Sequence, residues 1–342
     1  MCGTCTHYKN QHRALAGGIE TSRIAKLLNI VSRPEFLPAN SASLIIGLSW
    51  GFTLPVDIVW ELVVPLALAF SVITLVAAFA AQINTLSDYE LDLTDESKKE
   101  LVRAMGQLGP KKVKIAMLTE LSASLVLLLV LYMLQGKIAL LLMWMAAVFF
   151  AYSYSAPPLR LKSRSWFAAI TLVIVLSILP VTFVTYVFTT ALDYSFFLFL
   201  SGQALTVYAV IVPAEIRDYF GDKEMGIVTM TVRLGLVKAS LLGIALLSLG
   251  GTLCGAGLFL RLAHSSLPVL SACLVVMAMA YFYILGKYWK LYNLSRSLTA
   301  SENQNSTEQD IVQLAAKNPK WITLITQTIV FMCLILLVTK LI

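Results

Sequence analysis

Two acid-rich segments of this chain share the pattern Asp-Tyr-x-x-Asp. The first contains Asp88 and Asp92, the second contains Asp218 and Asp222, and each pair follows a long apolar stretch. Aspartates four residues apart lie on one face of a helix, where bare like charges repel each other unless a cation binds between them. Magnesium prefers oxygen ligands and commonly bridges one or two carboxylates to substrate phosphates. The four aspartates are therefore candidate ligands for magnesium carrying a diphosphate, with Asn84 as a further oxygen donor.

The alternative is that these acids are ordinary solvated loop charges. Six acidic residues lie between residues 88 and 100, beside Lys98 and Lys99. A single copy of the motif would leave that alternative open. Two copies at matched positions favour a metal site.

A third segment, YSYSAPPLRLKSR at residues 152–164, carries charges of the opposite sign. Arg160, Lys162 and Arg164 would supply cations for a diphosphate leaving group. Tyr152 or Tyr154 could present a ring face or hydroxyl to a developing carbocation. Taken alone, the segment fits equally well with tyrosines at a membrane interface and basic residues that set orientation.

Membrane helices must position these residues. The chain has 342 residues, of which 58% are hydrophobic and 13% charged, and its mean hydropathy is +0.80. That composition excludes a soluble globular domain. Runs of roughly 20 apolar residues predict an all-α integral membrane protein with nine transmembrane helices. The predicted spans are 41–56, 62–83, 115–135, 138–154, 166–189, 195–214, 239–260, 267–286 and 321–341.

The basic residues predict the orientation of these spans. With nine crossings, all but Lys137, Arg261 and Lys340 of the 26 Lys and Arg residues fall on one side. Basic loops favour the cytosolic side. We therefore expect a multi-pass protein of the cell membrane, with the N-terminus and the acidic motifs cytosolic and the C-terminus opposite. The net charge of +7 then reflects contact with anionic lipids and not nucleic-acid binding.

We divide the chain into a cytosolic N-terminal segment, 1–35, and a polytopic region, 36–342, with a flexible cytosolic loop at about 291–319. Residues 22–33 predict an amphipathic helix on the cytosolic membrane surface, and an ordinary packed helix before the first span is the alternative. Its apolar stripe consists of Ile24, Leu27, Leu28 and Val31. A cluster at the N-terminus resembles zinc ligands, but an unstructured tail is the favoured interpretation. That cluster consists of Cys2, Cys5, His7 and His12.

A weak internal repeat follows the acidic motifs. The first motif is followed by Arg103 and by Leu-Gly at Gly109, and the second by Arg233 and by Leu-Gly at Gly235. Internal repeats are frequent in membrane proteins with a central site. The pattern suggests two related helical halves around one central cavity.

The segment EIRDYFGDKEMGIVTMTVRLG at 215–235 resembles the second aspartate-rich motif of the UbiA superfamily of intramembrane prenyltransferases. NTLSDYELD at 84–92 resembles the first motif of that superfamily, and YSAPPLRLK is similar to the segment between the two. The order, the spacing and the nine spans also match, so the resemblance extends from Arg33 onward. It implies a UbiA-like fold and an enzyme that transfers an isoprenyl chain.

The resemblance also implies roles for individual residues. The four aspartates would bind Mg²⁺, and Asn84, Arg160 and Lys162 would bind the diphosphate. Tyr154 would lie near the allylic cation, so Tyr154, Arg160 and Lys162 form the expected catalytic set. We also assign Arg217 and Lys223, which flank the second motif, to diphosphate binding.

The chain departs from the pattern of the superfamily at three places. Thr85 occupies a position that commonly holds Asp or Gln. Glu215 occupies one that often holds Asp, and the exchange keeps an oxygen ligand. The segment ESKKELVRA, which includes Arg103, lacks an Arg-Pro element that many members carry. These departures leave the acceptor and the chain length open.

The expected substrates are a polyprenyl diphosphate, such as geranylgeranyl diphosphate, and a lipophilic acceptor. An aromatic, quinone-like or other redox-lipid precursor is the preferred acceptor. A glycerol-phosphate lipid, as for a digeranylgeranylglyceryl phosphate synthase, is the main alternative, and tetrapyrrole or carotenoid acceptors follow. Outside this class, the acids would suit a transporter with a cytosolic ion site, although carriers favour acids at the bilayer midplane. A non-catalytic scaffold would be expected to have lost some of the aspartates.

Overall fold

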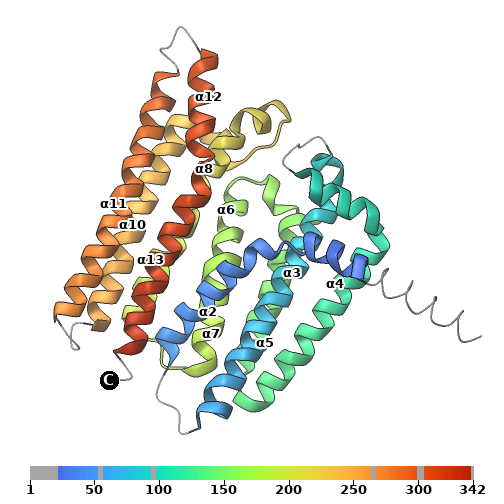
Figure 1. Ribbon diagram of the computed structural model, residues 1–342, viewed down its shortest axis with the longest axis vertical. Helices are drawn as coiled ribbons and strands as arrows, with labels where there is room; N and C mark the ends of the chain where they lie inside the picture. The colour runs from blue at the N-terminus through green and yellow to red at the C-terminus, as the bar shows by residue number, and fades with distance from the viewer. Residues whose placement is uncertain (1–21, 53–56, 94–97, 263–266, 299–303, 340–342) are drawn as a thin grey trace, which may run out of the picture.

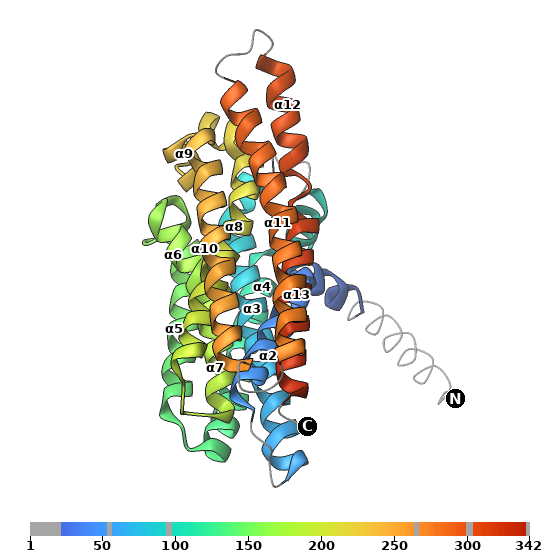
Figure 2. The same cartoon turned by 90° about the vertical axis from the view of Figure 1, so that its left-hand side faces the viewer.

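The computed structural model describes residues 22–52, 57–93, 98–262, 267–298 and 304–339. Within these ranges the chain is helical and contains no β-strand. Figures 1 and 2 show an elongated bundle of long, roughly parallel helices. After a helix at residues 22–31, the main helices are α2 (Leu37–Gly51), α3 (Val64–Asp92), α4 (Lys99–Gln135), α5 (Ile138–Ser155), α6 (Trp166–Val173), α7 (Leu179–Phe188), α8 (Tyr194–Glu224), α9 (Met230–Leu234), α10 (Leu236–Leu262), α11 (Leu267–Ser297), α12 (Gln304–Ala315) and α13 (Asn318–Val338).

Eight of the helical segments described are long and apolar enough to cross a membrane. One of them joins α6, the π-helical turn η5 (Ile174–Ile178) and α7 into a single segment. The expected boundary between the third and fourth spans is confirmed, because Gly136 ends α4 with a left-handed backbone at φ 65°. The predicted first span corresponds to α2, which has 15 residues and is shorter than the other eight. The count of nine crossings therefore stays a prediction.

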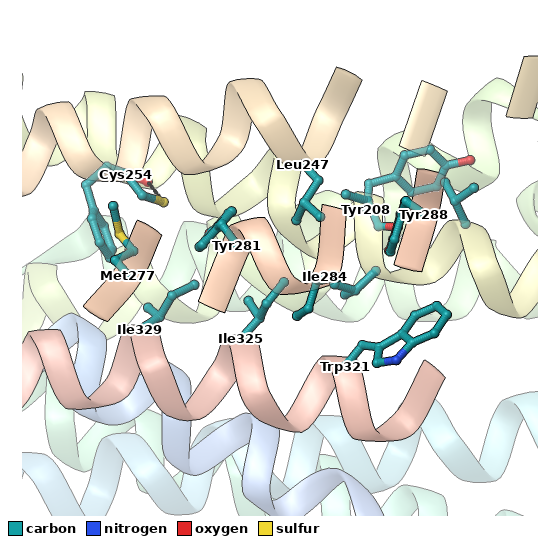
Figure 3. Close-up of a cluster of buried hydrophobic side chains, with 14 of the residues drawn as sticks. Tyr208, Leu247, Cys254, Met277, Tyr281, Ile284, Tyr288, Trp321, Ile325 and Ile329 are labelled. Carbon is teal, nitrogen blue, oxygen red and sulfur yellow. Dashed lines mark hydrogen bonds between the residues drawn. The ribbon is translucent and has the colours of Figure 1, made fainter. Parts of the chain in front are cut away.

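The bundle has two main packing regions. The larger hydrophobic core joins α8, α10, α11 and α13, and Figure 3 shows Tyr208, Leu247, Tyr281 and Ile325 converging within it. The second core joins α3, α4, α5 and α7. The contact of α8 with α10 requires glycine: a Cβ added at Gly257 would lie 2.7 Å from the backbone of Phe199. Small residues let membrane helices approach closely. The close packing of α8 against α10 therefore holds the second acidic motif, at the end of α8, in place.

The helix at residues 22–31 packs against the N-terminal part of α4. Val31 is fully buried there, together with Ala104, Met105 and Leu108. Ile24, Leu27 and Leu28 of the predicted apolar stripe pack against the same cluster. The predicted helix is thus present in the structure, and its apolar stripe packs against other parts of the protein. The zinc-like cluster at the N-terminus lies outside the described residues.

The structure differs from expectation in the predicted loop at about 291–319. Helix α11 continues to Ser297, and α12 occupies Gln304–Ala315. The low mean hydropathy of this segment conceals an apolar stripe at helical spacing. The stripe consists of Ile311, Leu314 and Ala315, which are buried in the larger core. The described residues of this segment are therefore largely helical, and α12 packs against the core.

Candidate active site

The first acidic motif lies on the last turns of α3. This helix continues without interruption to Asp92, so Asn84, Asp88 and Asp92 repeat every four residues along one face. Asp92 is buried, with 5% of its surface exposed, and Asp88 is partly buried. The expected helical face of oxygen donors is present.

The segment after α5 reaches directly onto this face. Both Arg160 and Lys162 form ion pairs with Asp88, and the distance from the Arg160 guanidinium to Oδ1 of Asp88 is 3.2 Å. The Lys162 ammonium also donates to Oδ1 of Asn84 at 3.3 Å, and the Ser155 hydroxyl donates to the same oxygen at 3.0 Å. The structure therefore brings the predicted diphosphate-binding cations to the first motif.

Burial and backbone conformation both constrain these cations. Desolvation lowers the pKa of Lys162, and the adjacent Asp88 carboxylate partly opposes that shift. Arg160 adopts a left-handed backbone at φ 38°. This conformation costs a non-glycine residue about 1–3 kcal/mol and persists where surrounding contacts enforce it. Its ion pair with Asp88 is one such contact.

The second acidic motif lies near the end of α8 and is paired differently. Arg217 binds both oxygens of its neighbour Asp218, at 2.7 and 2.9 Å. Asp222 is half-buried, and no side chain in the described part of the molecule forms an ion pair with it. Lys223 lies over the ring of Tyr219, with its ammonium 5.8 Å from the ring centre.

Glu215 connects the second motif to α9. Its Oε2 accepts hydrogen bonds from the Thr231 backbone N–H at 3.1 Å and from the Thr231 hydroxyl at 2.9 Å. Its Oε1 accepts from the Tyr208 hydroxyl at 3.4 Å. Both carboxylate oxygens thus accept hydrogen bonds from other residues of the protein. We interpret Glu215 as the residue that holds α9 against α8.

Two side chains connect the first motif with the second. Lys98 forms an ion pair with Asp92 at 2.7 Å, and its charge also acts on Asp222. The Tyr154 side chain is within electrostatic range of both Asp88 and Glu215. Lys98 and Tyr154 are therefore each within electrostatic range of an acidic residue in both motif segments.

The backbone after each motif supports the internal repeat. Gly109 interrupts α4 with φ 74° and ψ 156°, and Gly235 separates α9 from α10 with φ 76° and ψ 158°. Positive φ is accessible to glycine at little steric cost. In both halves an acidic helix end is followed by a short helix, a glycine kink and a long membrane helix.

The donor chemistry fits magnesium. The candidate ligands are carboxylate and amide oxygens, which hard divalent cations prefer over nitrogen or sulfur. The described residues contain no group of three or more His, Cys, Asp or Glu that would enclose a metal completely. Magnesium commonly takes one or two carboxylates and completes its shell with water and substrate phosphates. Asp88 and Asp92 on one side, and Asp218 and Asp222 on the other, match that requirement.

Other predicted residues lie away from this region or have local roles. The buried Thr85 hydroxyl donates to the carbonyl of Ala81 on its own helix, at 3.0 Å. Arg103 is exposed, and no contact in the described structure joins it to the motifs. Tyr152 is 49% exposed, so of the two candidate tyrosines Tyr154 is the one that faces the motifs.

Three site residues were not predicted: Ser155, Lys98 and Thr231. Ser155 lies inside the YSAPPLRLK segment, and Thr231 lies within the resemblance to the second motif, so their positions carried a signal. Lys98 was grouped with solvated loop charges, because sequence order gives no indication that it reaches between the motifs.

The comparisons agree with this fold. Residues 42–299 match the model of the UbiA prenyltransferase family. A solved structure concerning digeranylgeranylglyceryl phosphate synthase has a TM-score of 0.64 and 16% identity, covering 91% of this chain and 98% of the other. A UbiA homologue from Archaeoglobus fulgidus, bound to GPP and Mg²⁺, has a TM-score of 0.58 and 18% identity, covering 87% and 99%. The same homologue bound to DMAPP and Mg²⁺ has a TM-score of 0.57 and 17% identity, covering 87% and 98%.

A search of curated protein sequences found no match. The family match covers most of the chain, and the solved structures share its fold over nearly their full lengths. The protein is a multi-pass membrane protein and belongs to the UbiA prenyltransferase family.

Proposed function

We propose that this protein transfers an isoprenyl group from a polyprenyl diphosphate to a lipophilic acceptor, with magnesium, and releases diphosphate. The observation that carries the proposal is the convergence of three segments. Asp88 forms ion pairs with Arg160 and Lys162 from the segment after α5. Lys98 forms an ion pair with Asp92 and is within electrostatic range of Asp222. Such an arrangement of anions and cations suits a ligand that carries both a metal and phosphate charge.

Asp88, Asp92, Asp218 and Asp222 would hold magnesium, and Asn84 would add an amide oxygen. Bound magnesium supplies charge stabilisation of the departing diphosphate. Arg160 and Lys162 now neutralise Asp88, and they would neutralise phosphate oxygens when the substrate is bound. Arg217 and Lys223, both exposed on α8, would bind diphosphate at the second motif.

Tyr154 would stabilise the allylic cation after the diphosphate leaves. Its side chain is within electrostatic range of both Asp88 and Glu215, and aromatic faces attract cations. The surrounding helices would have to exclude water, which would otherwise capture the cation. The acceptor nucleophile then forms the new bond to the allylic carbon and loses a proton.

For the acceptor we propose an aromatic, quinone-like precursor. A glycerol-phosphate lipid is the second candidate, because a structure concerning digeranylgeranylglyceryl phosphate synthase shares the fold. The transporter alternative is not retained, since the chain belongs to a prenyltransferase family. We further propose that the acidic motifs face the cytosol, because nearly all basic residues fall on that side under the predicted topology.

The experiment is a transfer assay with purified full-length protein, magnesium and labelled geranylgeranyl diphosphate. One reaction contains an aromatic hydroxybenzoate or naphthoate acceptor, one contains geranylgeranylglyceryl phosphate, and one contains a membrane lipid extract. Mass spectrometry identifies the product. We expect a prenylated aromatic product that a chelator abolishes. If product forms only with the glycerol-phosphate lipid, that lipid and not the aromatic compound is the acceptor. If no product forms in any reaction, the proposed prenyl transfer is contradicted.

A further inference from the structure

A second charged site lies away from the acidic motifs. A cavity of about 460 Å³ lies between the C-terminal half of α11 and the junction of α12 with α13. None of the residues that line it belongs to either acidic motif or to segment 152–164. They are Tyr283, Lys287, Lys290, Leu314, Lys317, Lys320, Trp321 and Leu324.

Four of these eight residues are lysines, and none is acidic. Within the described structure, none of the four ammonium groups forms an ion pair with a carboxylate. The Lys287 ammonium instead lies over the ring of Tyr283, 4.7 Å from its centre. Like charges around one cavity repel each other unless an anion neutralises them. The site therefore has the charge of an anion-binding site without an internal counter-ion.

The cavity lies where a membrane interface is expected. Figures 1 and 2 show that α11 and α12 extend beyond α8 at the end of the bundle where α9 lies. Tyr283 and Trp289 are 54% and 56% exposed on α11. Exposed Tyr and Trp mark the headgroup level of membrane helices. We therefore expect the lysines to lie near the depth of the lipid phosphates.

The remaining wall of the cavity is apolar and firmly packed. Leu314 and Trp321 are buried. The ring of Trp321 lies 5.8 Å from that of Tyr288, and both are labelled in Figure 3. The Tyr288 hydroxyl donates to the carbonyl of Ala209 at 2.7 Å, which ties this wall to α8. An apolar wall beside four cations suits a ligand with an anionic head and hydrocarbon chains, and not a free soluble anion.

We propose that this cavity binds an anionic phospholipid, with the four lysines around its phosphate and the acyl chains along Leu314, Trp321 and Leu324. Basic pockets between membrane helices on the cytosolic side are suited to anionic lipid headgroups. The site is separate from the prenyl diphosphate site, and its occupancy is measured without any assay of transfer.

The test compares two variants that lose the same charge. The first replaces Lys287, Lys290, Lys317 and Lys320 with Gln. The control replaces Lys111, Lys112, Lys114 and Lys238 with Gln, all exposed at the same end of the molecule. Each full-length protein, in detergent, is titrated with phosphatidylglycerol and with phosphatidylcholine of the same acyl chains. Native mass spectrometry then gives the bound fraction of each lipid.

We expect wild type and the control variant to prefer phosphatidylglycerol by at least about tenfold, and the cavity variant to lose that preference. An equal loss in both variants would show diffuse surface attraction and overturn the proposal, as would a wild type without preference. Displacement of phosphatidylglycerol by millimolar glycerol phosphate would overturn the lipid assignment in favour of a soluble anion. If the fourfold variant does not fold, the pairs Lys287→Gln/Lys290→Gln and Lys317→Gln/Lys320→Gln are tested separately. Each pair is expected to weaken the preference, and an unchanged preference in both would contradict the site.

Discussion

The two acidic motifs have the same spacing and the same position at the end of a long helix, yet their side chains are paired differently. Asp88 in the first motif forms ion pairs with two basic side chains from a segment more than 70 residues away in sequence, and 13% of the Asp88 side chain is exposed. Asp222 in the second motif has no ion pair in the described structure, and its neighbour Asp218 pairs with the adjacent Arg217.

The difference suggests a division of work between the halves. The glycine kinks at Gly109 and Gly235 have nearly the same backbone angles, so the scaffold is repeated. The partners are not repeated, because in the described structure Arg160 and Lys162 form their ion pairs with Asp88 of the first motif. We infer that the first half supplies most of the cations for diphosphate and that Asp222 in the second half is the more available carboxylate.

The largest expected effect comes from removing one carboxylate charge in each half. Asp88→Asn and Asp222→Asn should each lower the rate of transfer by about 10²–10³-fold, because each removes a charged group from the metal site. Their effects on stability should differ. Asp88→Asn leaves Lys162 without its carboxylate and should lower the free energy of unfolding by about 1–3 kcal/mol. Asp222→Asn removes a carboxylate without an ion pair and should leave the melting temperature unchanged or raise it. Thermal unfolding in detergent measures this contrast, and equal destabilisation by both variants would contradict the difference in pairing.

The cations of the two halves should also contribute unequally. Lys162→Gln should lower kcat/KM for the prenyl diphosphate by about tenfold to a hundredfold, the value of one or two charge-assisted hydrogen bonds. Arg217→Gln should lower it by about two- to threefold, because exposed ion pairs contribute little. Arg164→Gln, exposed in the same segment as Lys162, is the control and should have no effect. A larger effect for Arg217 than for Lys162 would reverse the assignment of the halves.

The dependence of turnover on pH sharpens the role of Lys162. Its pKa is lowered by burial, so the ammonium loses its proton at a lower pH than an ordinary lysine. Because only the protonated form neutralises phosphate, kcat/KM should fall as pH rises through this lowered pKa. Lys162→Arg keeps its charge, since the guanidinium of arginine has a much higher pKa than the ammonium of lysine and stays protonated. The alkaline limb of the profile should therefore move to higher pH in Lys162→Arg, and an identical limb in both proteins would exclude Lys162 as its source.

The smallest effect concerns two threonines with different partners. Thr231→Val removes a hydroxyl donor to Glu215 and should lower the free energy of unfolding by about 1 kcal/mol. Thr85→Val removes only a hydrogen bond to the preceding turn of its own helix and should cost less. Transfer activity should fall in Thr231→Val, as α9 loosens beside the second motif, and stay constant in Thr85→Val. If only Thr85→Val reduced activity, the prediction would be wrong, and the Thr85 hydroxyl would have a role in the first motif beyond its hydrogen bond to Ala81.

The sequence predicts the helices of this fold better than the contacts between them. Apolar runs indicate the membrane spans, and the spacing of Asn84, Asp88 and Asp92 predicts their common face because α3 continues to Asp92. Mean hydropathy did not predict the helix α12, because this polar helix is stabilised by only a short stripe of buried apolar residues. The electrostatic influence of Lys98 on Asp222 and the hydrogen bonds from Thr231 to Glu215 depend on how the helices pack against one another. Local periodicity contains no information about that packing.

The central claim is that both motifs hold one magnesium diphosphate together. Isothermal titration calorimetry with a non-reactive thiolo analogue of geranylgeranyl diphosphate tests it without turnover. We predict that wild type binds the analogue only with magnesium, and that Asp88→Asn and Asp222→Asn each weaken binding by at least about tenfold. Wild-type affinity in Asp222→Asn, with the same dependence on magnesium, would contradict the claim by showing that the first motif binds the diphosphate alone.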